Sequence, residues 1–294
     1  MPSLSVTDLP WPSAANRIDL IAPDFETAGQ AEIEDALRAK SARSQARKHG
    51  GEWGERANAL ANLIDPKLQS EFPSTLASSR FFRLNRIQVC GALHQFVTEV
   101  GDGSFFRADI IKPGWACDFA DLHNLNPNRL LAEFRADVLR VLPANTKNGF
   151  RNGLAPAPGD FIFAGIHGEF DPLALRYQSH LHVGGSGVYV EAIDRVRKLK
   201  GYCPTITVRN PVRIKRTIYD LPGAITYLVK SYWPQRPFLP LGANGALKRP
   251  RRHNAQRINE PYHTDYLLWL DQWTLSDLVL LMGIRTGKNE FQFS

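Results

Sequence analysis

Two strand-like segments separated by a turn place the strongest limit on what this chain can fold into. They read "FIFAGIHGEF" and "YQSHLHVGG", and the turn between them carries Asp171 and Pro172. This arrangement predicts an antiparallel hairpin with the histidine-rich segment as its second strand. We therefore expect an α+β fold in which helices pack on a central, mainly antiparallel sheet.

Further strands are predicted on both sides of the hairpin. Upstream lie the segments "RFFRLNRIQV", which begins at Arg80, and "SFFRADIIK". Downstream, the segment "TITVRNPVRIKRTI" alternates apolar residues with threonine and basic residues, so one face is apolar and the other is cationic. Pro211 lacks a backbone N–H, which indicates that this strand lies at an edge or carries a bulge.

Helices are predicted between these strands and towards both ends of the chain. Thr27 caps a long segment rich in Ala, Glu and Arg, and residues from Trp53 to Ile64 show helical spacing. Asn126 and Asp220 cap two more helices, each with a proline in its first turn, and the second continues through "LPGAITYLVKSYW". The remaining helical segments are "GVYVEAIDRVRKLKG" and the apolar "DYLLWLDQWTLSDLVLLMGI".

Composition divides the chain into three parts. Residues 1–78 are predicted to form an irregular arm, over about the first 23 residues, followed by a basic helical extension. Residues 79–235 are predicted to form the sheet domain, and residues 236–294 a basic segment, "GALKRPRRHNAQR", followed by a helical closing element.

The overall composition is that of a soluble globular protein, with 43% hydrophobic and 22% charged residues. No apolar run approaches the roughly 18 residues that a membrane span needs, so we expect no membrane partner. The chain does not start with a basic and then an apolar stretch, and its three cysteines are odd in number and far apart. These features predict a cytoplasmic protein, and a net charge of +7 permits a nucleic-acid partner.

The histidines of the second hairpin strand are a candidate metal site. Side chains two residues apart on a strand share a face, so His180 and His182 project together while Leu181 points the other way. A metal needs at least one more ligand, which either His167 or Glu169 on the preceding strand can supply. With eight histidines in the chain, such a triplet also arises by chance, and two structural imidazoles are the alternative reading.

A tyrosine and a lysine downstream form a second candidate constellation. Tyr227 and Lys230 are three residues apart and share one face of the predicted helix. Between the two constellations runs an acid-free basic stretch that can neutralise phosphates, with Tyr202 and Trp233 available to stack bases. Its basic residues are Arg195, Arg197, Lys198, Lys200, Arg209, Arg213, Lys215 and Arg216.

The segment "HLH" on a strand, followed by "YLVK" on a helix, resembles the HUH single-strand DNA endonucleases, particularly rolling-circle replication initiators with one catalytic tyrosine. The order of strands and helices from about residue 80 to 234 is also similar. The early strand lacks the threonine-rich pattern common in such initiators, and the two terminal extensions match no part of that family.

This resemblance implies that His180 and His182 bind Mg²⁺ or Mn²⁺, that Tyr227 attacks a DNA phosphodiester and that Lys230 assists. The product would be a 5′-phosphotyrosine. The implied substrate is single-stranded DNA at a replication origin of a plasmid, phage or related element, with host replication proteins as further partners. Tyr219 and Tyr232 are alternative nucleophiles.

Other functions are compatible with parts of this pattern. A DNA-binding replication protein of the same fold would keep the basic residues and use the histidines structurally. A histidine-triad nucleotide hydrolase would have a third histidine at the next alternate position, which is Gly184 here. A barrel-type metallohydrolase would have repeated strand and helix units, which the sequence lacks.

Overall fold

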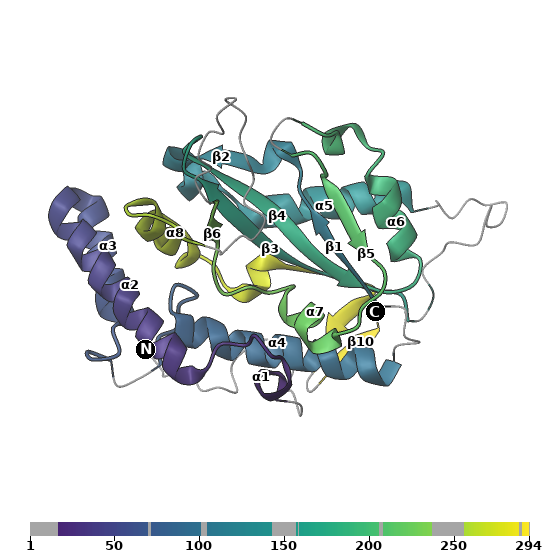
Figure 1. The fold of residues 1–294 in the computed structure, drawn as a ribbon, viewed down its shortest axis with the longest axis horizontal. Helices are drawn as coiled ribbons and strands as arrows, with labels where there is room; N and C mark the ends of the chain where they lie inside the picture. Colours follow the sequence, from purple (N-terminus) through teal and green to yellow (C-terminus); the bar gives the residue numbers. More distant parts are fainter. Residues whose placement is uncertain are drawn as a thin grey trace, which may run out of the picture.

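The computed structural model describes residues 17–69, 72–100, 105–142, 157, 159–205, 208–236, 256–287 and 290–293. They form an α+β fold with one mixed sheet of eight strands and a separate two-stranded sheet. Figure 1 shows the helices arranged around the large sheet. The helices are α1 (Ile18–Ile21), α2 (Ala28–His49), α3 (Gly51–Ile64), α4 (Ser79–Val100), α5 (Pro127–Val141), α6 (Tyr189–Val196), α7 (Leu221–Thr226) and α8 (Tyr262–Leu270). The strands are β1 (Phe106–Ile110), β2 (Ala116–Asp118), β3 (Ile162–Asp171), β4 (Arg176–Gly185), β5 (Val212–Lys215), β6 (Pro234–Gln235), β7 (Gln256–Arg257), β8 (Val279–Met282), β9 (Ile284–Thr286) and β10 (Phe291–Phe293).

The predicted hairpin is confirmed, and it forms the centre of the large sheet. The strand order is β5-β1-β4-β3-β6-β7, with β2 also paired to β4 and β8 to β3. Every pairing is antiparallel except that of β3 with β6, so the sheet is mainly antiparallel. In the hairpin register, His167 of β3 lies directly opposite His180 of β4. The turn therefore fixes which residues of the two strands meet.

The two faces of the sheet differ in chemistry. One face carries buried apolar side chains, among them Ala108, Ile166 and Leu181. The residues that alternate with them on the opposite face include the three hairpin histidines and two of the hairpin glycines. Figure 1 shows α7 next to both β5 and α4, and α4 and α7 contact each other. The polar face therefore holds the candidate site.

The long N-terminal helices form as predicted. The Thr27 side chain accepts a hydrogen bond from the Gln30 backbone N–H, and Gln30 returns one to the Thr27 backbone. This reciprocal capping starts α2 at Ala28. Helices α2 and α3 lie against each other and reach α4 and α8, and in Figure 1 the pair projects beyond the sheet.

The prediction of a strand at "RFFRLNRIQV" is wrong, because this segment lies inside α4. Buried Phe82, Val89, Leu93 and Phe96 recur at helical spacing over this 22-residue element. The first ten residues alone are rich in aromatic and branched side chains, which favour strands in a short window.

The prediction of a helical closing element is half wrong. Helix α8 ends at Leu270, and the apolar run beyond it becomes β8, which pairs Met282 with Ile162 of β3. The large sheet thus continues past residue 235, while the predicted three-part division of the chain stays a prediction. The arm also differs, since Ile18–Ile21 is a short helix. Residues 1–16 and 237–255, with most of the predicted basic segment, lie outside the described residues.

The other elements agree with the sequence in kind but are shorter in some cases. Asn126 caps α5, and α6 begins only at Tyr189. Of the predicted cationic strand, residues 206–207 are outside the described part, and Val212–Lys215 forms the edge strand β5 after Pro211. Among the described residues, no helix has the length and apolar character needed to cross a membrane.

Candidate metal and tyrosine centre

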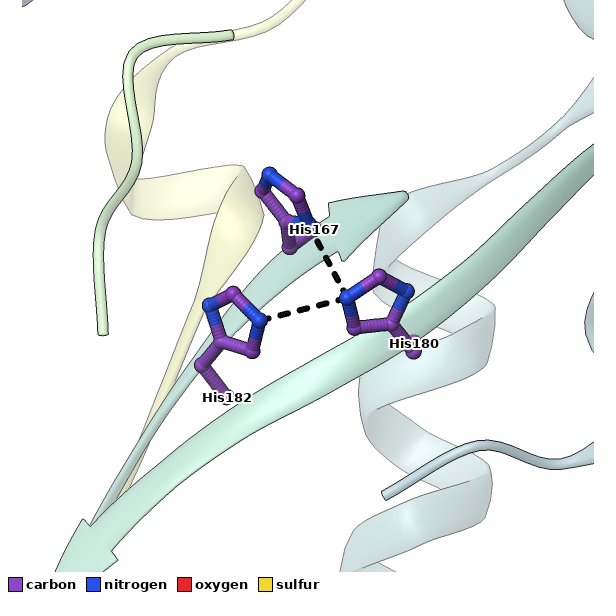
Figure 2. A group of neighbouring side chains, drawn as sticks. All are labelled: His167, His180 and His182. Carbon is purple, nitrogen blue, oxygen red and sulfur yellow. Dashed lines mark hydrogen bonds between the residues drawn. The ribbon is translucent and has the colours of Figure 1, made fainter. Parts of the chain in front are cut away.

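Three histidines from the two central strands converge on one point. The Nδ1 atom of His167 lies 2.9 Å from Nε2 of His180, which lies 3.2 Å from Nε2 of His182. Figure 2 shows the three rings turning these nitrogens towards one another. One nitrogen from each ring lies within 4.8 Å of the other two, close enough to bind a single ion.

The outward ring nitrogens fix the tautomers. His167 Nε2 lies 2.8 Å from the backbone carbonyl of Tyr232, and His182 Nδ1 lies 2.8 Å from that of Tyr227. A carbonyl only accepts hydrogen bonds, so these nitrogens carry the protons. His180 Nδ1 makes a longer contact of 3.4 Å with the carbonyl of Gln178. For His167 and His182, the nitrogens that point inward are therefore those with lone pairs.

Burial keeps these rings neutral. Burial is the main cause of a lowered pKa in all three rings, and it places the pKa of His167 and of His182 well below the ordinary value. The inward nitrogens of His167 and His182 are both acceptors, and Nε2 of His180, which lies within hydrogen-bond distance of each, can donate at most one proton. At least one inward lone pair is therefore left without a proton. The donor set fits a metal cation, and three imidazoles suit a transition ion such as Mn²⁺ better than Mg²⁺, which prefers oxygen.

His167 and Glu169, the two candidates for the third ligand, have different neighbours. Glu169 forms an ion pair with Arg236, which also reaches Asp171 at 3.2 Å. His167 instead lies in the cluster, opposite His180 in the hairpin register. Arg236, which lies far along the chain, thus pairs with the carboxylate of Glu169, the other candidate ligand.

Tyr227 lies against this cluster, although not on a helix as predicted. Helix α7 ends at Thr226, and Tyr227 is its C-terminal cap residue. The Tyr227 ring stacks on His182 with a centroid separation of 4.1 Å. The predicted meeting of Tyr227 with Lys230 still occurs, because the Lys230 Nζ lies 4.0 Å from the ring centroid, and the Arg107 guanidinium lies at the same distance. The turn after α7, rather than a helical face, brings the phenol and the ammonium together.

The electrostatics around Tyr227 favour the neutral phenol at rest. Burial first, and then the negative charge of Asp109, raise the pKa of Tyr227 to about 12. Arg107 acts in the opposite direction. Burial also lowers the pKa of Lys230, against the attraction of Asp109. A phenol in this setting needs a proton acceptor and additional positive charge before it can act as a nucleophile.

Asp109 is a site residue that the sequence reading missed. On β1 it lies opposite His182 of β4 on one side and Arg213 of β5 on the other. Its Oδ1 atom is buried, has no hydrogen-bond partner among the residues that the structure describes, and lies 3.9 Å from Nε2 of His182. The signal was present in the strand "FRADI", where Arg107 and Asp109 are two residues apart and so share one face.

Glycines allow the tyrosine segment to lie directly on the sheet. A Cβ atom at Gly165 would lie 2.2 Å from the backbone oxygen of Leu228, and one at Gly184 would lie 2.7 Å from the Leu228 side chain. Gly184 and Gly185 are the last residues of β4. Only a glycine leaves room for this close approach.

Helix α4 holds the same segment from the other side. Arg86 donates to the backbone oxygens of Val229, at 2.5 Å, and Thr226, at 3.3 Å, and forms an ion pair with Glu26. These carbonyls flank Tyr227 in the chain. A buried guanidinium thus positions the turn that carries the tyrosine.

The predicted basic stretch lies largely at the surface. All of its lysines and arginines are exposed except Arg195, which is half-buried. The stretch itself has no acid, but residues just before it supply partners: Glu191 lies 4.0 Å from Arg195, and Asp194 lies 3.2 Å from Arg197. Arg195 and Arg197 were predicted to be available for phosphates, but acidic residues three or four positions earlier on the helix pair with them.

The prediction that Tyr202 and Trp233 stack on bases is wrong. Tyr202 is buried and donates its hydroxyl hydrogen bond to Asp137. Trp233 is also buried, and its ring packs on Tyr266 and Trp269. Of the alternative nucleophiles, Tyr219 is 90% exposed, while Tyr232 is 44% exposed and directs its carbonyl to His167.

Comparisons with protein families, with curated proteins and with solved structures find no match to this chain.

Proposed function

We propose that this protein is a metal-dependent nickase and strand transferase that cuts and rejoins single-stranded DNA through Tyr227. One observation carries the proposal: three neutral imidazoles, two of them buried and the third half-buried, each turn one ring nitrogen to one point, and a tyrosine ring stacks on one of them. A metal ion held by His167, His180 and His182 would polarise a phosphate and stabilise charge on its oxygens.

The chemical step uses groups that lie around Tyr227. The phenolic oxygen attacks the scissile phosphorus, the new bond forms between them, and the bond from phosphorus to the 3′ oxygen breaks. The products are a 5′-phosphotyrosine and a free 3′-hydroxyl, and the energy of the phosphodiester is kept for rejoining. Asp109 is the carboxylate nearest the phenol and accepts its proton. A proton from solvent completes the leaving 3′-hydroxyl.

Two cations support the change of charge in this step. Arg107 and Lys230 each lie 4.0 Å from the Tyr227 ring centroid, so they favour the developing phenolate. They also attract the phosphate towards the attacking oxygen. This role for Lys230 agrees with the resemblance of "YLVK" to the tyrosine motif of HUH nucleases.

The edge strand next to β1 is the path we propose for the DNA backbone. Arg213 and Lys215 are exposed on β5, and Arg213 lies opposite Asp109 in the sheet register. Together with Lys198, Lys200, Arg209 and Arg216 they supply the positive charge that a single strand needs. The resemblance to rolling-circle initiators extends the proposal to the start of replication of a plasmid, phage or related element, inside the cytoplasm.

The test is the formation of a covalent adduct. Wild-type protein, Tyr227→Phe and the control Tyr219→Phe are incubated with Mn²⁺ and single-stranded DNA covering candidate origins, and then denatured. We expect a protein–DNA adduct at Tyr227, mapped by mass spectrometry, in the wild type and in Tyr219→Phe but not in Tyr227→Phe. If the wild type binds these strands and forms no adduct, the nickase proposal is wrong and a DNA-binding protein without catalysis takes its place.

A further inference from the structure

A cavity of about 700 Å³ opens beside Tyr232, the residue whose backbone oxygen contacts His167. Its wall joins parts of the chain far apart in sequence: the segment before α2, one side of α2, the residues before β6, and Arg257 with His263. A volume of this size is typical of sites for small organic ligands. Much of the wall comes from the N-terminal extension, which has no counterpart in the family that the sequence resembles.

Tyr232 connects the cavity to the metal cluster. Its backbone oxygen accepts the hydrogen bond of His167, while its side chain lines the cavity and is 44% exposed. A ligand that stacks on the Tyr232 ring therefore contacts the same residue that holds His167 through its backbone oxygen. The phenol ring offers a broad face for stacking.

Tyr227 and the cavity residue Tyr232 contact different histidines of the cluster. Tyr227 stacks on His182 at 4.1 Å, His182 stacks on His167 at 4.6 Å, and the outward Nε2 of His167 lies 2.8 Å from the backbone oxygen of Tyr232. A phosphate at the cluster would thus have the attacking tyrosine on one side and the cavity on the other.

The chemistry of the wall favours a neutral, planar ligand over a phosphate. Glu34 lies 2.8 Å from Arg38 and 2.9 Å from Arg257, so one carboxylate is shared between the two guanidinium groups. Asp24 adds negative charge to the wall. Aromatic faces next to hydrogen-bonding amide, carboxylate and guanidinium groups are the features that bind nucleobases.

We propose that this cavity binds the base of the nucleotide immediately 5′ of the scissile phosphate. In an in-line displacement the leaving oxygen lies opposite the attacking oxygen, so the nucleotide that ends in the leaving 3′ oxygen extends away from Tyr227 and towards the cavity. The inference rests on the proposed nickase function, and it assigns to the N-terminal extension a part in sequence recognition.

The first arm of the test measures base stacking without cleavage. Single-stranded DNA that carries 2-aminopurine at scattered positions is titrated with wild-type protein and with Tyr232→Ala, Tyr232→Phe and the control Tyr219→Ala. We expect fluorescence quenching by the wild type, Tyr232→Phe and Tyr219→Ala. Binding by Tyr232→Ala should be about tenfold weaker, as for the loss of one stacked base. Equal binding and quenching by Tyr232→Ala overturns the inference.

The second arm reads the base preference of cleavage. A randomised single strand is cut by each protein with Mn²⁺, and both product ends are sequenced. We expect the base preference just 5′ of the nick to flatten in Tyr232→Ala alone, with preferences 3′ of the nick unchanged. An unchanged preference at the 5′ position, or a change only at 3′ positions, overturns the inference. Stacking that depends on Tyr232 in a protein that forms no adduct refutes the nickase and supports the base cavity.

Discussion

Replacing Gly165 by alanine should disable the tyrosine while leaving the three histidines in place. The added Cβ would lie 2.2 Å from the Leu228 backbone oxygen, and real Cβ contacts essentially never fall below 3.0 Å. The segment that carries Tyr227 must therefore move by about 0.8 Å or more. Overpacking of this kind costs about 1–3 kcal/mol of stability. A displacement of this order in a reacting group costs up to about 100-fold in rate.

The assay compares the rate of adduct formation with Mn²⁺ affinity and with the free energy of unfolding. The proposed metal ligands belong to β3 and β4, so we expect Mn²⁺ affinity to fall less than the adduct rate. Gly114→Ala is the matched control, because a Cβ at that position meets no atom within 4 Å. Wild-type rate and stability in Gly165→Ala would refute the close packing of Leu228 on the sheet, and with it this account of how Tyr227 is positioned.

Three further predictions concern single side chains. His167→Gln should weaken Mn²⁺ binding, measured by calorimetry, by at least about 10-fold. Glu169→Gln should change it by no more than a few-fold, because Arg236 pairs with that carboxylate. A larger loss of affinity in Glu169→Gln than in His167→Gln would exclude His167 as the ligand. Asp109→Asn should slow adduct formation by roughly 100-fold while single-strand affinity stays the same or rises, and an unchanged rate would remove Asp109 from proton transfer. Burial opposes ionisation of Glu260, but contacts with His263, Ser41 and Thr264 outweigh it and lower the pKa of Glu260 to about 2. The stability from this ionised group is complete above about pH 4.5 and is lost as the pH falls towards 2. The free energy of unfolding of Glu260→Gln, measured in urea, should therefore be about 2–3 kcal/mol lower than that of the wild type at pH 6, and the two should converge near pH 2. A difference that persists at low pH would contradict this origin.

Local periodicity was sufficient for the hairpin and its histidines. An alternation of period two puts His180 and His182 on one face whatever the rest of the chain does, and the turn at Asp171 brings the preceding strand alongside. The caps at Thr27, Asn126 and Asp220 likewise depend on a few neighbouring residues. The strand prediction within α4 failed because ten residues are too few to distinguish a buried helix from a strand.

The composition of the site depended on contacts between distant segments. Arg236 withdraws Glu169 from the histidines, and Asp109 enters the site because β1 pairs with β4. Tyr227 reaches the cluster because Gly165 admits its segment and Arg86 holds it, although the helix that was expected to carry it ends one residue earlier. Spacing along one element fixes the direction in which its side chains point, whereas strand register and the burial of partners fix what those side chains meet, and these arise only when separate elements pack together.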